Sequence, residues 1–228
     1  MSLREICLQE NKKLSTSNLV VLTWGNVSIR YEDNVYIKPS GVSYDHMIAD
    51  NIAVVSLSTG KHISGQKPSV DLKTHLELYK NFTEIESVAH THSKFCTSFA
   101  QSQIPIKCLG TTHADYFYGT IPVTKQLTSK QIEGDYEGNT GAKIIELFNK
   151  LELSYKEMPG VLVRNHGVFT WGLSFSDAFK HAFVMEQIAE MAYHSHVLSD
   201  KEPSKLPQYI LDKHYERKHG KSAYYGQR

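Results

Sequence analysis

The chain has 228 residues, with 25 lysines and arginines against 24 acidic residues and a formal net charge of +1. This balance disfavours a nucleic-acid-binding or membrane-surface protein, because either normally carries a basic excess. The length suits one domain over residues 1–228, with a core that needs no disulfides. The three cysteines lack CxxC spacing and the N-terminus lacks a signal peptide's apolar run. We therefore expect a cytoplasmic protein with reduced thiols and no membrane span.

The first sixty residues predict a helix followed by strands. Residues 2–14 carry apolar side chains at helical spacing. Apolar and polar side chains alternate over residues 27–31, and residues 35–37 follow a polar trio. This pattern predicts a β-hairpin with Glu32-Asp33-Asn34 as its turn. Residues 53–58 form a short β-branched run that is typical of a strand.

The middle of the chain alternates between helical and strand patterns. Residues 70–80 predict an amphipathic helix, with Ser69 as its N-cap. Residues 85–91 favour a strand, residues 94–101 a helix, and residues 160–163 another strand. Because strands and helices intermix throughout, we expect an α/β fold built in layers.

The longest helical pattern covers residues 176–198. Ser176 and Asp177 suit its start, and the periodicity predicts that Phe179, Phe183 and Ile188 face inward.

A pair of histidines is the sharpest local feature. His90 and His92 are two apart in a predicted strand, so their side chains point to the same face and could form half of a metal site. The alternative is two polar residues near a strand end. His194 and His196 have the same spacing in a helical pattern, where such residues do not face each other, and we assign them to a solvated helix face.

Two further residues could complete a metal site. His166 follows the strand predicted over residues 160–163, where a ligand could project from the sheet edge. Asp71 lies in the first turn of its predicted helix, where an acid that interacts with the helix dipole is the alternative interpretation.

Three segments have features of anion sites. Lys38-Pro39-Ser40-Gly41 places a basic residue before a turn, Trp24-Gly25-Asn26 precedes a strand, and Lys67-Pro68-Ser69 puts a hydroxyl at a helix N-terminus. Each of them alone is also compatible with an ordinary turn or cap.

Near the C-terminus, His214, Arg217 and Lys218 are spaced to share one helical face, which is also typical of a solvated basic tail. Asp115 lies in a polar stretch where an isolated acid is normally a loop residue.

Together these segments resemble the class II aldolase/adducin-like family, and within it the L-ribulose-5-phosphate 4-epimerases. The block around Asp115 and the tail that ends near Tyr225 are more specific than the metal pattern, which aldolases share. The matching blocks are residues 22–28 (LTWGNVS), 37–42 (IKPSGV), 90–93 (HTHS), 110–122 (GTTHADYFYGTIP), 158–163 (MPGVLV), 171–172 (WG), 213–215 (KHY), 217–220 (RKHG) and 223–227 (AYYGQ).

The resemblance implies a three-layer α/β/α sandwich with a central, largely antiparallel sheet. It also implies a homotetramer with active sites at subunit interfaces, an isolated monomer being inactive. The implied cofactor is Zn²⁺, with Mn²⁺ or Co²⁺ as alternatives, and the implied substrate is a pentulose phosphate. The implied metal ligands are Asp71, His90, His92 and His166.

The resemblance further implies an acid–base pair, Asp115 and Tyr225, supported by His214 and Arg217. The other residues that the resemblance implies in phosphate or substrate binding are Gly25, Asn26, Lys38, Ser40, Gly41, Ser69 and Val70. Val70 replaces a serine that the family usually carries, so we expect weaker substrate affinity with an unchanged reaction. The segment 164–168 also differs from the commoner family pattern, although His166 is retained.

The implied reaction inverts C4 of a 2-ketopentose, whose C4 hydrogen is not acidic because it is not adjacent to the carbonyl. The chain has no GxG fingerprint for a dinucleotide, so we expect cleavage and re-formation of the C3–C4 bond instead of transient oxidation. The alternatives are an L-fuculose-1-phosphate aldolase-like enzyme and a non-enzymatic assembly module like the adducin head. The presence of His90, His92 and His166 disfavours the assembly module.

Overall fold

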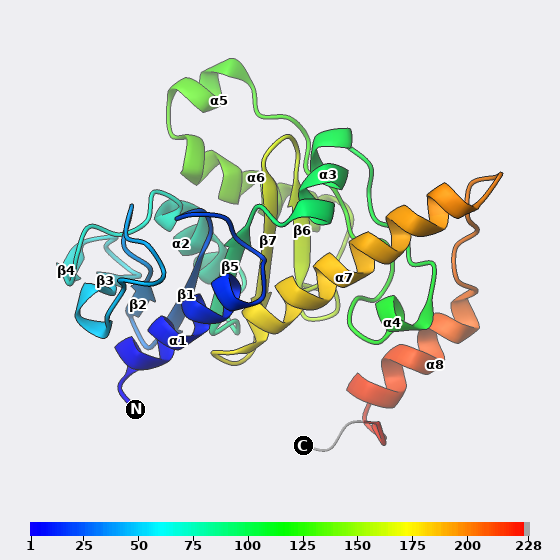
Figure 1. Cartoon of the computed structure of the whole chain (residues 1–228), viewed down its shortest axis with the longest axis horizontal. Coiled ribbons are helices and arrows are strands. Elements are labelled where there is room, and N and C mark those ends of the chain that lie inside the picture. Colours follow the sequence, from blue (N-terminus) through cyan, green and yellow to red (C-terminus); the bar gives the residue numbers. More distant parts are fainter. Residues whose placement is uncertain (226–228) are drawn as a thin grey trace.

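The computed structural model describes residues 1–225, and a seven-stranded sheet lies at its centre (Figure 1). The strand order is β4-β3-β2-β1-β5-β7-β6, and every neighbouring pair is antiparallel. The strands are β1 (Asn26–Tyr31), β2 (Asn34–Ile37), β3 (Ala53–Ser56), β4 (His62–Ser64), β5 (Ser87–Thr91), β6 (Gly160–Val163) and β7 (Gly167–Gly172).

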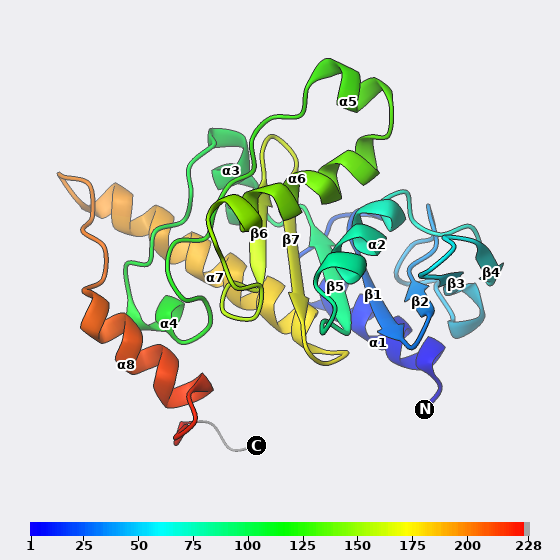
Figure 2. The same ribbon diagram turned by 180° about the vertical axis from the view of Figure 1, so that it is seen from behind.

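Helices cover both faces of this sheet. In Figure 1, α1 and α7 lie in front of the strands, and Figure 2 shows α2 and α6 on the opposite face. The expected three-layer α/β/α arrangement is confirmed. The helices are α1 (Leu3–Thr16), α2 (Leu72–Asn81), α3 (Lys94–Ser102), α4 (Thr111–Ala114), α5 (Ser129–Glu133), α6 (Tyr136–Lys150), α7 (Asp177–Leu198) and α8 (Gln208–His219), with a short 3₁₀ helix, η1 (Ala49–Asn51).

The predicted hairpin forms, with a tighter turn than the sequence indicated. Tyr31 pairs with Asn34, so only Glu32 and Asp33 lie outside the ladder. Glu32 adopts a left-handed φ of 53°. Asp33 fixes the turn, because its carboxylate accepts hydrogen bonds from Ser56, the last residue of β3, and from Ser58 just after it.

Two predictions about helices were wrong. Ser69 is not the N-cap of α2, because the helix begins at Leu72 and Asp71 occupies the cap position. The Ser69 hydroxyl accepts a hydrogen bond from the side chain of Asn26 and a longer one, at 3.4 Å, from the backbone N–H of Asp71. In α7, Phe183 is 41% exposed and does not face inward. Small residues of α7, such as Ala182, face the sheet, which lets the helix lie close to β5 and β7.

Backbone from three segments comes together at the C-terminal end of β5, a central strand of the sheet. Gly25 has a φ of +74°, and a Cβ there would lie 2.7 Å from the carbonyl oxygen of His90, so a side chain would disrupt this approach. On the other side of β5, the β6–β7 hairpin turns through Asn165, which has a φ of 58° and presents His166. This geometry brings the two histidine segments together.

The C-terminal helix α8 packs against α4 at one end of the molecule, away from β1 and β2 (Figures 1 and 2). Across residues 1–225, none of the helices combines the length and the apolar character needed to cross a bilayer.

Candidate metal and phosphate site

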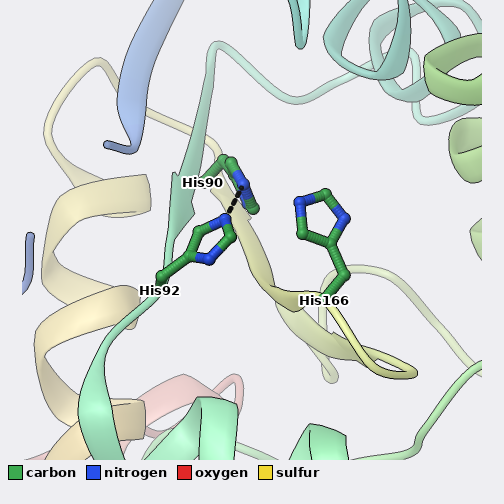
Figure 3. Close-up of side chains that lie close together, drawn as sticks. All are labelled: His90, His92 and His166. Atoms are coloured by element: carbon green, nitrogen blue, oxygen red, sulfur yellow. Dashed lines mark hydrogen bonds between the residues drawn. The ribbon is translucent and has the colours of Figure 1, made fainter. Parts of the chain in front are cut away.

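Three histidines from two segments converge at one point. His90 is on β5 and only 1% exposed, His92 follows the strand directly, and His166 projects from the β6–β7 turn. One ring nitrogen of each lies within 4.8 Å of the others, and Figure 3 shows the rings facing one another. The Nε2 atoms of His90 and His92 are 3.0 Å apart. Since zinc–imidazole bonds are about 2.1 Å long, a single ion can contact both nitrogens.

The ring of His90 is oriented by the backbone. Its Nδ1 lies 2.9 Å from the carbonyl oxygen of Val168. A carbonyl only accepts hydrogen bonds, so Nδ1 of His90 is the donor and Nε2 is the nitrogen that faces the other histidines. Backbone carbonyls commonly orient metal-binding histidines in this way.

The surroundings keep His92 and His166 neutral. Burial and the neighbouring His90 lower the pKa of His92 to about 4. Burial, followed by His90 and His92, lowers the pKa of His166 to about 3. Near neutral pH both rings therefore keep a lone pair for a metal ion, which is the form that binds.

Asp71 lines the same pocket at the N-terminus of α2, although the tight cluster consists of the three histidines alone. Asn26 donates a hydrogen bond to its carboxylate across 2.8 Å. Burial pushes the pKa of Asp71 upward, but His90, His75 and the Asn26 hydrogen bond outweigh this effect and lower the pKa overall. The pocket thus offers three imidazoles and an ionised carboxylate, a donor set that fits Zn²⁺, Mn²⁺ or Co²⁺.

The predicted phosphate residues line this pocket, whose volume is about 460 Å³. All seven of the predicted phosphate residues lie next to the three histidines. They are Gly25, Asn26, Lys38, Ser40, Gly41, Ser69 and Val70. Gly41 has a φ of +72°, the left-handed region that favours glycine, and lies in the turn after Lys38.

Lys38 supplies the positive charge of the pocket. Its side chain is 2% exposed, and burial lowers its pKa to about 8 although Asp71 acts in the opposite direction. Among the described residues, the ammonium donates only long hydrogen bonds, 3.3 and 3.4 Å, to the carbonyls of Thr23 and Pro39. A dianionic phosphate would compensate this buried charge better than these two carbonyls.

Asp115, His214, Arg217 and Tyr225 form a second cluster. Arg217 on α8 contacts both carboxylate oxygens of Asp115, and His214 Nδ1 lies 3.2 Å from Oδ1. The guanidinium carbon of Arg217 lies 4.3 Å from the centre of the Tyr225 ring. Gly226 and Gln227, which complete the C-terminal block, lie outside the described residues.

The two clusters are separate within one chain. The pocket is lined from β1, the turn after β2, α2, β5, the β6–β7 turn and the start of α6, without any of the four residues of the second cluster. Those four belong to the segment after α4 and to α8 with its tail, at the other end of the molecule (Figures 1 and 2). The structure therefore places the predicted metal and phosphate residues in one cluster. It places the predicted acid–base residues in a second, distant cluster.

Comparison with known proteins places this architecture in one family. Residues 6–193 match the model of the Class II Aldolase and Adducin N-terminal domain. The chain belongs to this family.

Solved structures of low sequence identity share the class II aldolase fold. An L-fuculose 1-phosphate aldolase matches with a TM-score of 0.78 and 21% identity over 94% of this chain and 95% of its own. YgbL from Klebsiella pneumoniae, named as a candidate aldolase/epimerase/decarboxylase, matches with a TM-score of 0.71 and 24% identity over 92% and 96%. The L-fuculose-1-phosphate aldolase of Thermus thermophilus matches with a TM-score of 0.69 and 19% identity over 88% and 98%.

Within this class II aldolase domain, the sequence interpretation missed two residues of the pocket wall. Tyr136 and Glu137 begin α6 and line the pocket, and the Tyr136 hydroxyl lies 3.2 Å from Nδ1 of His166. The helix itself was not predicted. Ile144 and Phe148, four residues apart on its buried face, were the available signal.

A third missed residue lies beneath the pocket. His75 is completely buried on α2, and its Nδ1 lies 2.7 Å from the Ser28 hydroxyl, which also contacts Tyr79. Its Nε2 has no hydrogen-bond partner among the described residues. Burial lowers the pKa of His75 to about 3, so the ring is neutral.

Proposed function

We propose that this class II aldolase family member is an L-ribulose-5-phosphate 4-epimerase, an isomerase that interconverts L-ribulose 5-phosphate and D-xylulose 5-phosphate. One observation carries the choice of an epimerase: Asp115 and Tyr225 both contact the guanidinium of Arg217, within a single cluster. Inversion at C4 needs two proton-transfer groups, one for each orientation of the C4 oxygen. In this proposal residues 1–228 act as one domain.

Asp115 and Tyr225 share the proton transfers. One of them takes the proton of the C4 hydroxyl as the C3–C4 bond breaks, which leaves glycolaldehyde phosphate and the enediolate of dihydroxyacetone. The aldehyde then rotates, the enediolate carbon attacks its other face, and the C3–C4 bond re-forms. The other residue of the pair returns a proton to the new C4 oxygen. Arg217 and His214 hold the Asp115 carboxylate in place during these steps.

His90, His92, His166 and Asp71 would hold the divalent ion, which supplies Lewis acidity for the negative charge of the enediolate. The phosphate is bound by Lys38 and by the turn at Ser40 and Gly41. This binding matters because the aldehyde must rotate without leaving. The exposed Val70 side chain, 61% accessible, offers no hydrogen bond to the phosphate.

The separation of the two clusters supports a homotetramer in which each active site combines the metal and phosphate residues of one subunit with Asp115 and Tyr225 of the next. In this arrangement a monomer is inactive.

A second candidate is a class II aldolase that releases both cleavage products. The fold similarity to the L-fuculose 1-phosphate aldolase, at a TM-score of 0.78, favours it, since the two activities share the metal-assisted C–C cleavage. The fate of the aldehyde distinguishes the two candidates.

The test is conversion of L-ribulose 5-phosphate to D-xylulose 5-phosphate, before chelation, after chelation and after return of zinc. Loss and recovery of the activity support the epimerase. Release of dihydroxyacetone and glycolaldehyde phosphate by a zinc-bound protein identifies the aldolase, and a protein that binds no metal and converts no substrate points to an assembly module.

Subunit complementation tests the shared site. Co-expression of His92→Ala and Asp115→Asn chains should restore part of the activity, because mixed tetramers contain sites in which both positions are unaltered. The matched control combines His92→Ala with His166→Ala chains, whose defects affect the same half of the site, and should stay inactive. Recovery in the control, or none in the first mixture, contradicts the shared site.

A further inference from the structure

The Tyr136 hydroxyl contacts Nδ1 of His166, the ring nitrogen that points away from His90 and His92. It lies 3.2 Å from Nδ1, and the two rings are 5.8 Å apart between centroids. Figure 3 shows a ring nitrogen of His166 turned toward His90 and His92, while its second nitrogen points away from them. Since Nδ1 contacts Tyr136, the nitrogen that faces the other two histidines is Nε2.

We propose that Tyr136 is a positioning residue, which accepts a hydrogen bond from Nδ1–H of His166 and thereby keeps Nε2 unprotonated and directed at the metal position. The inference rests on the metal site of the proposed function and deepens it.

The direction of this hydrogen bond decides whether His166 can act as a ligand. A neutral imidazole carries one proton on one of its two nitrogens. When Nδ1–H donates to the phenol oxygen, Nε2 keeps its lone pair. When the phenol donates instead, the proton of the neutral ring lies on Nε2, between the three rings, and this tautomer of His166 has no lone pair there for a metal ion. A partner on the outer nitrogen selects the first form.

The phenol is suited to accept. A phenolic hydroxyl offers lone pairs on its oxygen as well as its own O–H group. The oxygen can therefore accept from His166 while its own O–H remains available to a ligand in the pocket, which Tyr136 also lines.

The position of Tyr136 is set by the contact between α2 and α6. Thr74 on α2 donates a hydrogen bond to the carbonyl oxygen of Glu137 across 2.7 Å. Lys73 forms an ion pair of 2.9 Å with Asp135, the N-cap of α6. These contacts attach the first turn of α6 to the first turn of α2, the helix that Asp71 caps.

Gly141 allows the two helices to approach so closely. A Cβ at this position would lie 2.6 Å from the Cβ of Glu77 on α2, so any larger residue would push α6 away. The helix pair therefore fixes Tyr136, and through it His166, relative to Asp71. His90 differs, since its outer partner is the backbone carbonyl of Val168, which a side-chain substitution does not remove.

The first experiment determines the tautomer of His166 by ¹⁵N imidazole NMR in the metal-free protein at pH 7.5. We expect Nδ1–H in the unaltered chain and a mixture of tautomers in Tyr136→Phe, which removes only the hydroxyl. The control is Tyr155→Phe, whose hydroxyl donates to Glu84 across 3.1 Å at the surface, and it should leave the His166 spectrum unchanged. An Nε2–H tautomer in the unaltered chain, or an unchanged one in Tyr136→Phe, overturns the inference.

The second experiment measures Co²⁺ binding and the visible spectrum of the Co²⁺ form. Loss of an outer hydrogen-bond partner typically weakens metal affinity 10- to 100-fold, so we expect at least about 10-fold weaker binding for Tyr136→Phe and a shifted spectrum. Gly141→Ala should weaken binding in the same direction although Tyr136 is intact. Affinity and spectrum equal to those of the unaltered chain in Tyr136→Phe contradict the inference.

The two experiments separate this inference from the proposed function. Absence of metal binding in the unaltered chain would refute the proposed metal site, while the tautomer measurement, which needs no metal, would still decide the role of Tyr136. Absence of epimerase activity in a metal-binding protein would refute the proposed reaction alone.

Discussion

Arg217 holds Asp115 through both carboxylate oxygens, with Nη2 2.9 Å from Oδ2 and 3.0 Å from Oδ1, and Nε 3.2 Å from Oδ1. Asp115 follows α4, within the family match over residues 6–193, whereas Arg217 lies on α8 beyond its end. The C-terminal helix thus orients a carboxylate of the aldolase domain. Because the guanidinium also lies against Tyr225, a substrate brought to this surface would meet both groups.

Removal of the Tyr225 hydroxyl should affect turnover without affecting the metal. General acid–base groups contribute typically 10²- to 10⁴-fold, so we expect Tyr225→Phe to lower kcat at least about 100-fold. Metal content, measured on the same preparation, should match that of the unaltered chain. Full activity in this variant would remove Tyr225 from the proposed pair.

Truncation of His92, a central histidine of the site, should remove both the bound metal and the activity. His92 lies 3.0 Å from His90 across the proposed ion position, so His92→Ala should lose the metal and the activity together. The control is His194→Ala, which alters a helix-face histidine and should keep both. A zinc-bound, active His92→Ala protein would contradict the proposed ligand set.

Phosphate binding should weaken in alkaline solution. The pKa of Lys38 is lowered to about 8, so its ammonium is charged below this pH and neutral above it. We expect KM for the sugar phosphate to rise between pH 7.5 and 9.5. Lys38→Met should show a high KM at both pH values. A flat KM in the unaltered chain would argue against Lys38 as the phosphate partner.

The metal-free protein should lose stability in acid. The pKa of His75 is about 3 in the folded state and 6.5 in the unfolded state, so between these values only the unfolded chain binds the proton. Stability therefore falls as pH drops below 6.5, and at pH 5 this residue accounts for about 2 kcal/mol. Urea unfolding at pH 7 and pH 5 should show a smaller loss for His75→Gln. An equal loss in both proteins would show that other groups cause the acid sensitivity.

The start of α3 depends on a buried acid of α7. Glu186 is 7% exposed and accepts hydrogen bonds from the backbone N–H groups of Phe95 and Cys96, at 2.8 and 3.0 Å. Glu186→Leu leaves both donors unsatisfied and should cost about 2 kcal/mol or more of unfolding free energy. Glu186→Gln keeps one acceptor and should cost less. Equal stability of the leucine variant and the unaltered chain would refute this role.

The sequence alone predicted those parts of the site that depend only on the local geometry of neighbouring residues. Alternation of side chains along a strand puts His90 and His92 on one face, and Pro39, Ser40 and Gly41 are residue types that favour a turn. These features depend on residues close together in the chain, so periodicity and turn chemistry determined them. Resemblance to known blocks contributed the roles of Asp115 and Tyr225.

Tertiary structure decided what depends on distant residues. Ser69 was excluded as the cap of α2 only by the start of the helix at Leu72, and its hydroxyl is held by Asn26, 43 residues earlier. Phe183 fits the inward periodicity of α7, but small side chains such as Ala182 form the face that packs on the sheet. The partnership of Tyr136 with His166 and the separation of Asp115 from the histidines arise when long loops close, and the energies that select among such closures are not encoded in any local pattern.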